Sequence, residues 1–187
     1  MHGNKNAEYI DNIIRKLAEH KSRIQLINLN VDNLTMPEYN ALLTSTSFYE
    51  KIPTETFLIF QTDSMICPND NKIIDNYLNY DYVGAPWAHH NQEVGNGGFS
   101  LRKKSKALQK IKNCPYNGEN EDLYFSSDKC EGPLKPDFDE AKLFSNESIY
   151  TNHSFGVHKV WTIFSPDDLK AKIKNCDGLN TLIQLNK

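Results

Sequence analysis

The sequence predicts a single α/β domain over residues 1–187. Segments with apolar residues at helical spacing alternate with short runs of β-branched and aromatic residues, which is the pattern of mixed helix and strand. No internal repeat, linker or low-complexity tract divides the chain. The length is sufficient to bury a core, and a content of 39% hydrophobic and 24% charged residues is ordinary for a soluble globular protein.

The first expected elements are a helix, a strand and a second helix. Residues 6–20 carry apolar side chains at helical spacing, residues 24–29 alternate and favour a strand, and Pro37 marks a helix start. The apolar run Thr56–Phe60, which is bounded by prolines, then predicts a buried strand. Because a helix comes first, the chain departs from the usual strand-first order of Rossmann-like nucleotide domains.

The rest of the chain continues this alternation. The polar stretch His89 to Gln92 is expected to be an exposed loop, and the lysines of residues 103–112 a solvated helix face. Ser165 begins a further helix in the manner of a capping box, and Gly178 would end it. The expected elements are a helix over 73–78, a strand over 82–87, helices over 103–112 and 123–127, a turn over 132–136, a strand over 141–145, an extended segment over 153–161 and a helix over 166–175.

Composition and charge exclude several function classes. A formal net charge of -3 lacks the surplus of Lys and Arg that binding to a nucleic-acid backbone needs. No apolar segment approaches the roughly 20 residues of a membrane span, and residues 1–12 show no signal-peptide core. Cys67, Cys114, Cys130 and Cys176 form no C-x-x-C pair, so we expect reduced, mostly buried thiols and a cytoplasmic location.

A polar tripeptide follows the expected strand Thr56–Phe60 directly. Gln61, Thr62 and Asp63 would emerge at the sheet edge where α/β proteins place their ligands. A carboxylate at the end of a buried strand costs desolvation energy unless a cation or hydrogen-bond donors compensate it, so Asp63 is a candidate metal ligand. An Asp at such a position is also a common turn former or helix cap, and the tripeptide alone does not decide between these interpretations.

Two further stretches allow both a functional and a structural interpretation. Gly95 to Gly98 holds three glycines in four residues, so a substrate could approach its backbone closely, although a hairpin or bulge explains the glycines equally well. Glu121 and Asp122 open an expected helix, where the helix dipole favours acidic residues. One of these carboxylates could instead point into a cleft and act as a base.

Five short blocks follow one another along the chain: Phe57 to Asp63, Asp81 to Trp87, Gly95 to Arg102, Glu119 to Asp122 and Phe155 to Lys159. Taken together and in this order, they resemble a family of glycosyltransferase-like domains long labelled as of unknown function. The resemblance covers about residues 28 to 161. It implies the GT-A nucleotide-sugar transferase fold, a three-layer αβα sandwich around a Rossmann-like mixed sheet.

The resemblance implies a metal centre. Gln61-Thr62-Asp63 is similar to the family's D-x-D motif, with Gln61 in place of the first Asp, so Asp63 would hold Mn²⁺ or Mg²⁺ against the diphosphate of a nucleotide sugar. His158 matches the position from which similar enzymes bring a histidine to the metal, and an imidazole ligand would favour Mn²⁺. A core or surface histidine is the alternative interpretation of His158.

The resemblance also implies where catalysis and substrate binding take place. Of the acidic pair, Asp122 would take the proton of an acceptor hydroxyl and Glu121 would bind or orient the acceptor, although the sequence does not separate the two roles. Trp87 could stack on a sugar face or could simply pack in a loop. The residues implied in substrate binding are Gln61, Thr62, Trp87, Asn96, Gly97, Gly98, Arg102 and Lys159.

The implied function is the metal-dependent transfer of a sugar, with inversion, from a nucleotide-sugar donor to a hydroxyl of a glycan or another acceptor. Relatives carry a strand and a helix before the position that matches His2-Gly3-Asn4, so the chain is expected to be an N-terminally shortened GT-A-like domain. A non-catalytic carbohydrate- or partner-binding module that kept the fold is the alternative. A two-metal phosphohydrolase built on Asp63 and Glu121 is less favoured, because the chain lacks the clustered Asp and His ligands of such sites.

Overall fold

The computed structural model describes residues 1–89 and 93–187, which form two compact units, Met1–Leu42 and Leu43–Lys187. Residues 90–92, part of the loop that the sequence predicts to be exposed, lie outside the described residues. The expectation of one domain over residues 1–187 stays a prediction.

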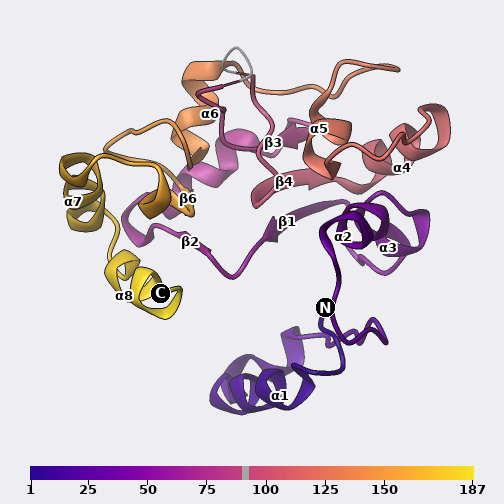
Figure 1. Ribbon diagram of the computed structural model, residues 1–187, viewed down its shortest axis with the longest axis horizontal. Helices are drawn as coiled ribbons and strands as arrows, with labels where there is room; N and C mark the ends of the chain where they lie inside the picture. The colour runs from indigo at the N-terminus through magenta and orange to yellow at the C-terminus, as the bar shows by residue number, and fades with distance from the viewer. Residues whose placement is uncertain (90–92) are drawn as a thin grey trace. The chain divides into compact units, whose positions relative to one another are not determined.

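The first unit begins with an interrupted helix. Helix α1, Ala7–Lys16, is followed by the 3₁₀ helix η1, Ala18–Arg23 (Figure 1). The helix expected over residues 6–20 therefore changes geometry at Leu17, whose N–H is shared between two carbonyls of α1. Such shared hydrogen bonds are common at helix ends.

Besides α1, this unit contains one short pair of parallel backbone segments. The strand expected over residues 24–29 is reduced to one isolated bridge, between His2 and Asn28, because only the few residues before α1 run beside it. Helix α2, Met36–Leu43, begins where Pro37 predicted a helix start.

The described strands of the second unit form two three-stranded sheets. They are β1 (Thr56–Phe60), β2 (Ser64–Ile66), β3 (Tyr82–Val83), β4 (Phe99–Lys103), β5 (Ser145–Asn146) and β6 (Gly156–His158). In the first sheet the order is β1-β4-β3 and each neighbouring pair is antiparallel. In the second sheet the order is β2-β6-β5, with β2 antiparallel and β5 parallel to β6.

The α/β class is confirmed, but a single Rossmann-like mixed sheet in a three-layer sandwich is not evident in the described part of the chain. The chain leaves the first sheet after Phe60, turns through Gln61 to Asp63 and enters the second sheet at Ser64, so the run of strand is divided between two sheets. Strand β1 has the predicted bounds, but it is an edge strand rather than a buried one, and Phe60 is 68% exposed.

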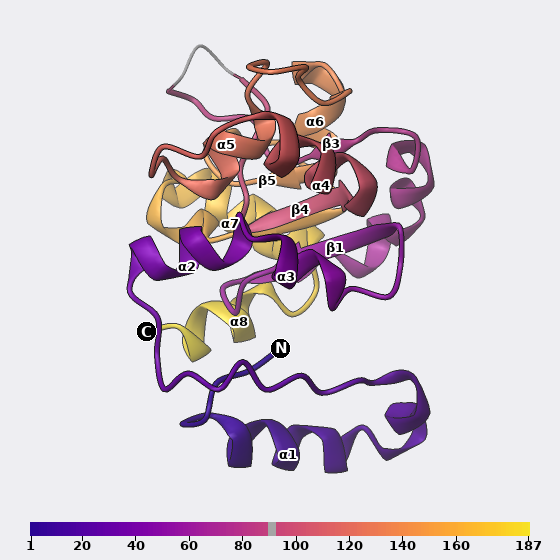
Figure 2. The same ribbon diagram turned by 90° about the vertical axis from the view of Figure 1, so that its right-hand side faces the viewer.

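Helices surround the two sheets of the second unit. They are α3 (Thr46–Glu50), η2 (Pro68–Tyr77), α4 (Lys104–Asn113), α5 (Glu121–Ser126), α6 (Phe138–Phe144), η4 (Val160–Thr162), α7 (Pro166–Asn175) and α8 (Leu179–Leu185). Helices α4 and α5 lie over the same side of strand β4 (Figure 2). The bounds of α4, α5 and α7 agree with the sequence-based expectations within one or two residues.

Several elements differ from those expectations. The helix expected over residues 73–78 is the longer 3₁₀ helix η2, Pro68–Tyr77, and the strand expected over residues 82–87 is reduced to β3, Tyr82–Val83. The strand expected over residues 141–145 is mostly helix α6, because the Asp137 carboxylate caps it by accepting the N–H of Glu140 at 2.9 Å. Gly178 lies beyond the end of α7, but a further helix, α8, starts directly after it. Lys110, expected on a solvated face, is buried, and its amine donates to two backbone carbonyls.

Each sheet packs against its own apolar cluster. Phe99 and Leu101 of β4 pack with side chains of η2 and α6, whereas Val157 of β6 packs with side chains of α7 and α8. Because side chains alternate along a strand, Ser100 and Arg102 of β4 point to the opposite face from Phe99. The buried members of the two clusters are Tyr77, Val83, Phe99, Leu101, Phe144 and Phe155 in the first, and Cys67, Val157, Val160, Cys176, Leu179 and Ile183 in the second.

The start of β4 and strand β6 touch at two glycines, Gly98 directly before β4 and Gly156 in β6. The ring of His158, at the end of β6, lies against Gly98, and a Cβ at Gly98 would collide with that ring. In the same way the ring of Phe99 lies against Gly156 at the start of β6, where a Cβ would also collide. Each glycine therefore permits the close approach of a ring from the other sheet. The contact places His158 beside the turn after β1, since the N–H of Gln61 donates to Gly98 O at 2.8 Å.

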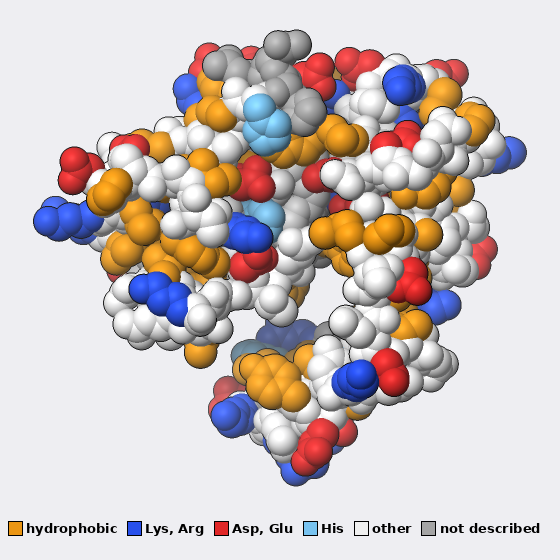
Figure 3. Space-filling model, viewed as in Figure 1, with side chains coloured by type: hydrophobic (Ala, Val, Ile, Leu, Met, Phe, Trp, Pro, Cys, Tyr) orange, Lys and Arg blue, Asp and Glu red, His pale blue; other side chains and the backbone are white. Residues whose placement is uncertain are grey.

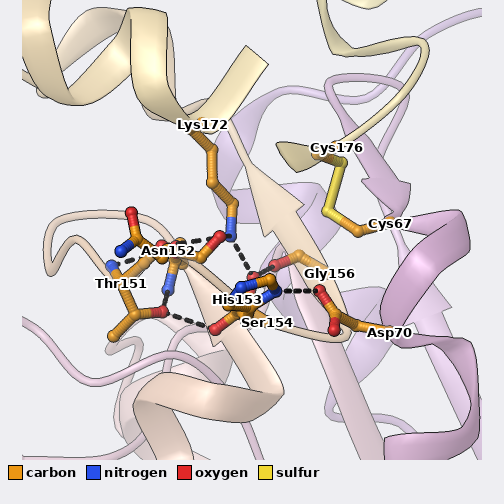
Figure 4. The surroundings of a disulfide bond; sticks show 10 residues. Cys67, Asp70, Thr151, Asn152, His153, Ser154, Gly156, Lys172 and Cys176 are labelled. Carbon is orange, nitrogen blue, oxygen red and sulfur yellow. Dashed lines mark hydrogen bonds and ion pairs between the residues drawn. A yellow bond between two sulfur atoms is a disulfide. The ribbon is translucent and has the colours of Figure 1, made fainter. Parts of the chain in front are cut away.

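Two disulfides, Cys67–Cys176 and Cys114–Cys130, join segments that are 109 and 16 residues apart, and no cysteine of the described residues is free. The expectation of reduced thiols is therefore wrong, although Cys67, Cys114 and Cys176 are buried as expected. Figure 4 shows the first bond between the segment that follows α7 and the residue before η2. Because disulfides persist in oxidising compartments, they favour an extracytoplasmic location over the expected cytoplasmic one.

In the part of the chain that the structure describes, no helix is both long enough and apolar enough to cross a membrane.

A buried lysine lies near the Cys67–Cys176 disulfide (Figure 4). Lys172 of α7 donates to Ser154 Oγ at 2.7 Å, so its amine ties the segment before β6 to α7. Burial lowers the pKa of Lys172 to about 8, and the Asp70 carboxylate opposes this shift only in part. The amine is therefore held by polar contacts that do not fully replace water.

We expect the two disulfides to contribute unequally to stability. Replacing Cys67 and Cys176 together by Ala should lower the free energy of unfolding by about 4–5 kcal/mol, and replacing Cys114 and Cys130 by about 3 kcal/mol, because the longer loop restricts the unfolded chain more. Urea denaturation of the wild type and of the two double variants measures both losses of stability. Reactive thiols in the denatured, unreduced wild type would contradict the pairing.

The buried amine of Lys172 predicts a pH dependence of stability. The folded state favours the neutral amine, so the wild type should gain stability as the pH rises from about 8 to the ordinary pKa of 10.5. Lys172→Met should lack this gain, which amounts to about 3 kcal/mol. Lys170→Met, at an exposed position of α7, is the control. Urea unfolding between pH 7.5 and 10.5 measures the difference, and equal pH slopes for the wild type and Lys172→Met would contradict this account.

Candidate functional site

Polar side chains from the turn after β1 meet the histidine that ends β6. Gln61 and Asp63 lie between β1 and β2, and His158 pairs with Ser64 in the register of β2 and β6. The Oδ1 atom of Asp63 lies 3.3 Å from His158 Nε2, and the Oε1 atom of Gln61 lies 3.2 Å from the same nitrogen. The antiparallel pairing therefore brings into contact the two side chains that the sequence predicts as metal ligands.

The two separations from His158 Nε2 are compatible with a divalent cation. Two atoms bound at right angles to an octahedral ion, each at roughly 2.1 Å, lie about 3 Å apart, which is close to the separations measured from His158 Nε2. Asp63 Oδ1 is buried and makes no hydrogen bond with the described residues, so a cation would satisfy it. No group of three or more His, Cys, Asp or Glu within the described ranges could hold a metal by itself. The remaining ligands would therefore come from Gln61, from water or from a substrate.

The acidic side chains around His158 are partly accessible. The side chains of Asp63 and Glu147 are 20% and 14% exposed, and that of His158 is 8% exposed. Figure 3 shows histidine and acidic side chains together in a recess on one face of the second unit. The exposed fractions of Asp63 and Glu147 leave these carboxylates accessible to a small ligand.

Asp122 lies on the other side of the dipeptide Gly97-Gly98 from His158. Its Oδ2 accepts the N–H of Gly97 at 3.2 Å, and its Oδ1 accepts the N–H of Leu123 at 2.8 Å. Burial raises the pKa of Asp122 and the neighbouring Glu121 carboxylate raises it further, while these hydrogen bonds oppose the shift. A carboxylate with a raised pKa is a stronger base, which suits it to accept a proton from a hydroxyl.

Arg102 and Glu121 form a buried ion pair. Arg102 Nη1 donates to Glu121 Oε2 at 2.6 Å and Nη2 donates to Oε1 at 3.1 Å, and the two side chains are only 1% and 5% exposed. Burial alone would lower the pKa of Arg102, but Glu121 holds it well above its ordinary value. Because both charged groups are engaged with each other, the geometry favours a structural role over the substrate-binding role implied for Arg102 and the acceptor role implied for Glu121.

Two other residues implied in substrate binding are buried. Trp87 is 5% exposed and its ring lies against Gly95, where a Cβ would collide with it. Asn96 is also 5% exposed, and both ends of its amide are used: Nδ2 donates to Glu147 Oε1 at 2.7 Å and Oδ1 accepts the N–H of Gly98 at 3.1 Å. These contacts favour a packing role for Trp87. They favour a role for Asn96 in positioning Glu147 and Gly98.

Thr62 and Lys159 are exposed and lie next to the metal-ligand candidates in sequence. The N–H of Lys159 donates to the carbonyl of Asp63 at 3.0 Å, and the backbone of Lys159 is left-handed, with φ 52°. Thr62 and Lys159 therefore lie next to Asp63 and His158, and an anion can reach their exposed side chains.

Glu147 is a further residue of the site, which no sequence pattern indicated. This residue follows β5, and its Oε1 lies 3.3 Å from His158 Nδ1. Neither spacing nor composition distinguishes a glutamate in the run Ser-Asn-Glu-Ser. Its position results from the parallel pairing of β5 with β6, which is a long-range contact without a local signal.

A family model described as "Protein of unknown function (DUF5672)" matches residues 23–158. The matched residues extend over the turn after β1, the glycines before β4, the start of α5 and the whole of β6. No curated protein and no solved structure matches the chain.

The buried Arg102–Glu121 pair predicts a large loss of stability when one charge is removed. Glu121→Gln should lower the free energy of unfolding by about 3–5 kcal/mol, because it leaves the Arg102 guanidinium buried without a counter-charge. Asp128→Asn removes the exposed partner of Lys135 and should cost less than about 1 kcal/mol. Urea denaturation measures both values, and similar losses in the two variants would contradict the assigned burial.

Proposed function

The chain belongs to the DUF5672 family, and from the groups around His158 we propose that it is a metal-dependent glycosyltransferase that moves a sugar from a nucleotide-sugar donor to an acceptor hydroxyl with inversion. The supporting observation is the approach of Asp63 Oδ1 and Gln61 Oε1 to His158 Nε2, with the carboxylate of Asp122 across the glycine backbone. A GT-A-like arrangement of the strands is part of the same proposal.

Asp63, Gln61 and His158 would hold Mn²⁺ or Mg²⁺. When bound, the cation would coordinate the donor diphosphate and neutralise the negative charge that develops on it as the sugar departs. The backbone holds these side chains in place: the Gln61 N–H donates to Gly98 O at 2.8 Å, and the Asp63 carbonyl accepts the Lys159 N–H at 3.0 Å. The exposed Thr62 hydroxyl and Lys159 amine would bind phosphate oxygens of the donor.

Asp122 would act as the general base. The acceptor hydroxyl gives its proton to Asp122 while its oxygen forms a bond to the anomeric carbon, and the bond from that carbon to the diphosphate breaks, with its electron pair leaving on the diphosphate. Such a single displacement inverts the anomeric centre. A positioned carboxylate contributes roughly 10²–10⁴-fold to the rate, and the raised pKa of Asp122 strengthens it as a base.

The competing functions receive less support from the described residues. A carbohydrate-binding module would use Trp87 as a stacking platform, but that ring is 5% exposed and covers Gly95. A two-metal phosphohydrolase would use Glu121 as a ligand, but both oxygens of Glu121 accept hydrogen bonds from Arg102.

Nucleotide binding tests the proposal. UDP or GDP should raise the Tm of the wild type only when Mn²⁺ is also present, because a ligand that binds only the folded state stabilises it by about 2.7 kcal/mol at 100 times its Kd. Asp63→Ala should abolish this shift. Asp122→Asn should keep the shift and lose sugar transfer.

Differential scanning fluorimetry with nucleotide alone, metal alone and both together provides the measurement. A shift that persists in Asp63→Ala would contradict the metal assignment. The absence of a shift with either nucleotide would contradict the proposed donor class.

A further inference from the structure

The ring of His158 lies between two carboxylates. On the Nε2 side, Asp63 Oδ1 is 3.3 Å away, and on the Nδ1 side, Glu147 Oε1 is 3.3 Å away. The Nδ1 atom is buried and has no hydrogen bond of good geometry among the described residues, so Glu147 is its electrostatic neighbour. Because the two side chains are only 8% and 14% exposed, water screens this interaction little.

Glu147 is itself held in place by Asn96, in the segment that precedes β4. Asn96 donates from Nδ2 to Glu147 Oε1 at 2.7 Å and accepts the N–H of Gly98 at Oδ1, at 3.1 Å. The ring of His158 lies against Gly98. Each of these four residues, Glu147, Asn96, Gly98 and His158, therefore contacts the next. These contacts hold the Glu147 carboxylate in place without any ligand.

Asp63 and Glu147 cannot bind one cation together with His158. The two carboxylates approach different nitrogens of the same ring, so an ion at Nε2 beside Asp63 is out of reach of the oxygen at Nδ1. In the general pattern a ligating histidine donates its second N–H to a carboxylate, and Glu147 Oε1 lies on that side of the ring, 3.3 Å from Nδ1, although without a hydrogen bond. Glu147 is thus placed to act on the metal through His158.

We propose that Glu147 is the positioning residue of the metal centre, an inference that rests on the proposed function of Asp63 and His158. With a cation bound at Nε2, Glu147 would favour the proton of the neutral imidazole on Nδ1, so that the lone pair of Nε2 is directed at the cation. In the opposite tautomer the N–H of Nε2 donates to Gln61 Oε1, which lies 3.2 Å away while no cation is bound, and leaves no lone pair for a cation. The Nδ1 lone pair would then face the negative charge of Glu147, which disfavours that tautomer.

The positioning of His158 also determines which metal is preferred. An imidazole nitrogen is a better ligand for Mn²⁺ than for Mg²⁺, which prefers oxygen. Losing the correct tautomer should therefore weaken Mn²⁺ binding more than Mg²⁺ binding. A residue with only a structural role would change both affinities in the same proportion.

Metal binding in four proteins tests this inference: the wild type, Glu147→Gln, His158→Ala and the double variant. The Kd for Mn²⁺ in the presence of UDP is measured from the EPR signal of free Mn²⁺, and the Kd for Mg²⁺ by competition. Glu147→Gln should weaken Mn²⁺ binding about 10-fold and Mg²⁺ binding less. Pulsed EPR should show nitrogen coupling to Mn²⁺ in the wild type and a weaker coupling in Glu147→Gln. The double variant should bind Mn²⁺ no more weakly than His158→Ala, because Glu147 acts only through the imidazole.

Two further variants control the experiment. Glu131→Gln removes one negative charge at an exposed position outside the site and should leave the Mn²⁺ affinity unchanged. Glu147→Asp keeps the charge but withdraws it by one methylene, so it should give an intermediate affinity and provides the test if Glu147→Gln does not fold.

The results that would contradict this inference differ in whether they also contradict the proposed function. Equal Mn²⁺ affinity in the wild type and Glu147→Gln would overturn this inference alone. An additional loss when Glu147→Gln is combined with His158→Ala would also overturn it, because Glu147 would then act without the imidazole. No Mn²⁺ binding by the wild type with UDP would overturn both this inference and the proposed function.

Discussion

The close contact between strands β4 and β6 is the constraint on which the candidate site depends. The ring of His158 lies against Gly98, directly before β4, and the ring of Phe99 lies against Gly156 of β6, and even a methyl group at either glycine would collide. Because packed interiors tolerate little change in volume, this contact fixes the position of the imidazole. The antiparallel pairing of β2 with β6 then brings Asp63 to one edge of the ring, and the parallel pairing of β5 with β6 brings Glu147 to the other.

The charged groups of the site have different environments, and this difference suggests different roles. Arg102 and Glu121 neutralise each other in the interior, where an unpaired charge would be costly. Asp122, the next residue, accepts two backbone N–H groups, and its partial burial raises its pKa. Two adjacent carboxylates that look equivalent in the sequence are thus separated by their surroundings into a structural group and a candidate base.

Local signals predicted much of the fold, and long-range contacts account for what they did not predict. The bounds of β1 and α7 follow from an apolar run and a capping serine, which are features of the segment itself. The division into two sheets, the disulfides and the position of Glu147 depend on residues far apart in the chain, and a single sequence does not reveal them. For the site, the pairing of Asp63 with His158 was expected from the family resemblance, and the contact is present.

The location of a bound metal tests the central claim most directly. Crystals grown with Mn²⁺ and UDP, with diffraction data collected at the manganese absorption edge, would locate the ion by its anomalous scattering. The account predicts a peak within bonding distance of Asp63 Oδ1 and His158 Nε2, with Glu147 remaining at Nδ1 of the same ring. A peak bound elsewhere, or no peak at these atoms, would contradict it.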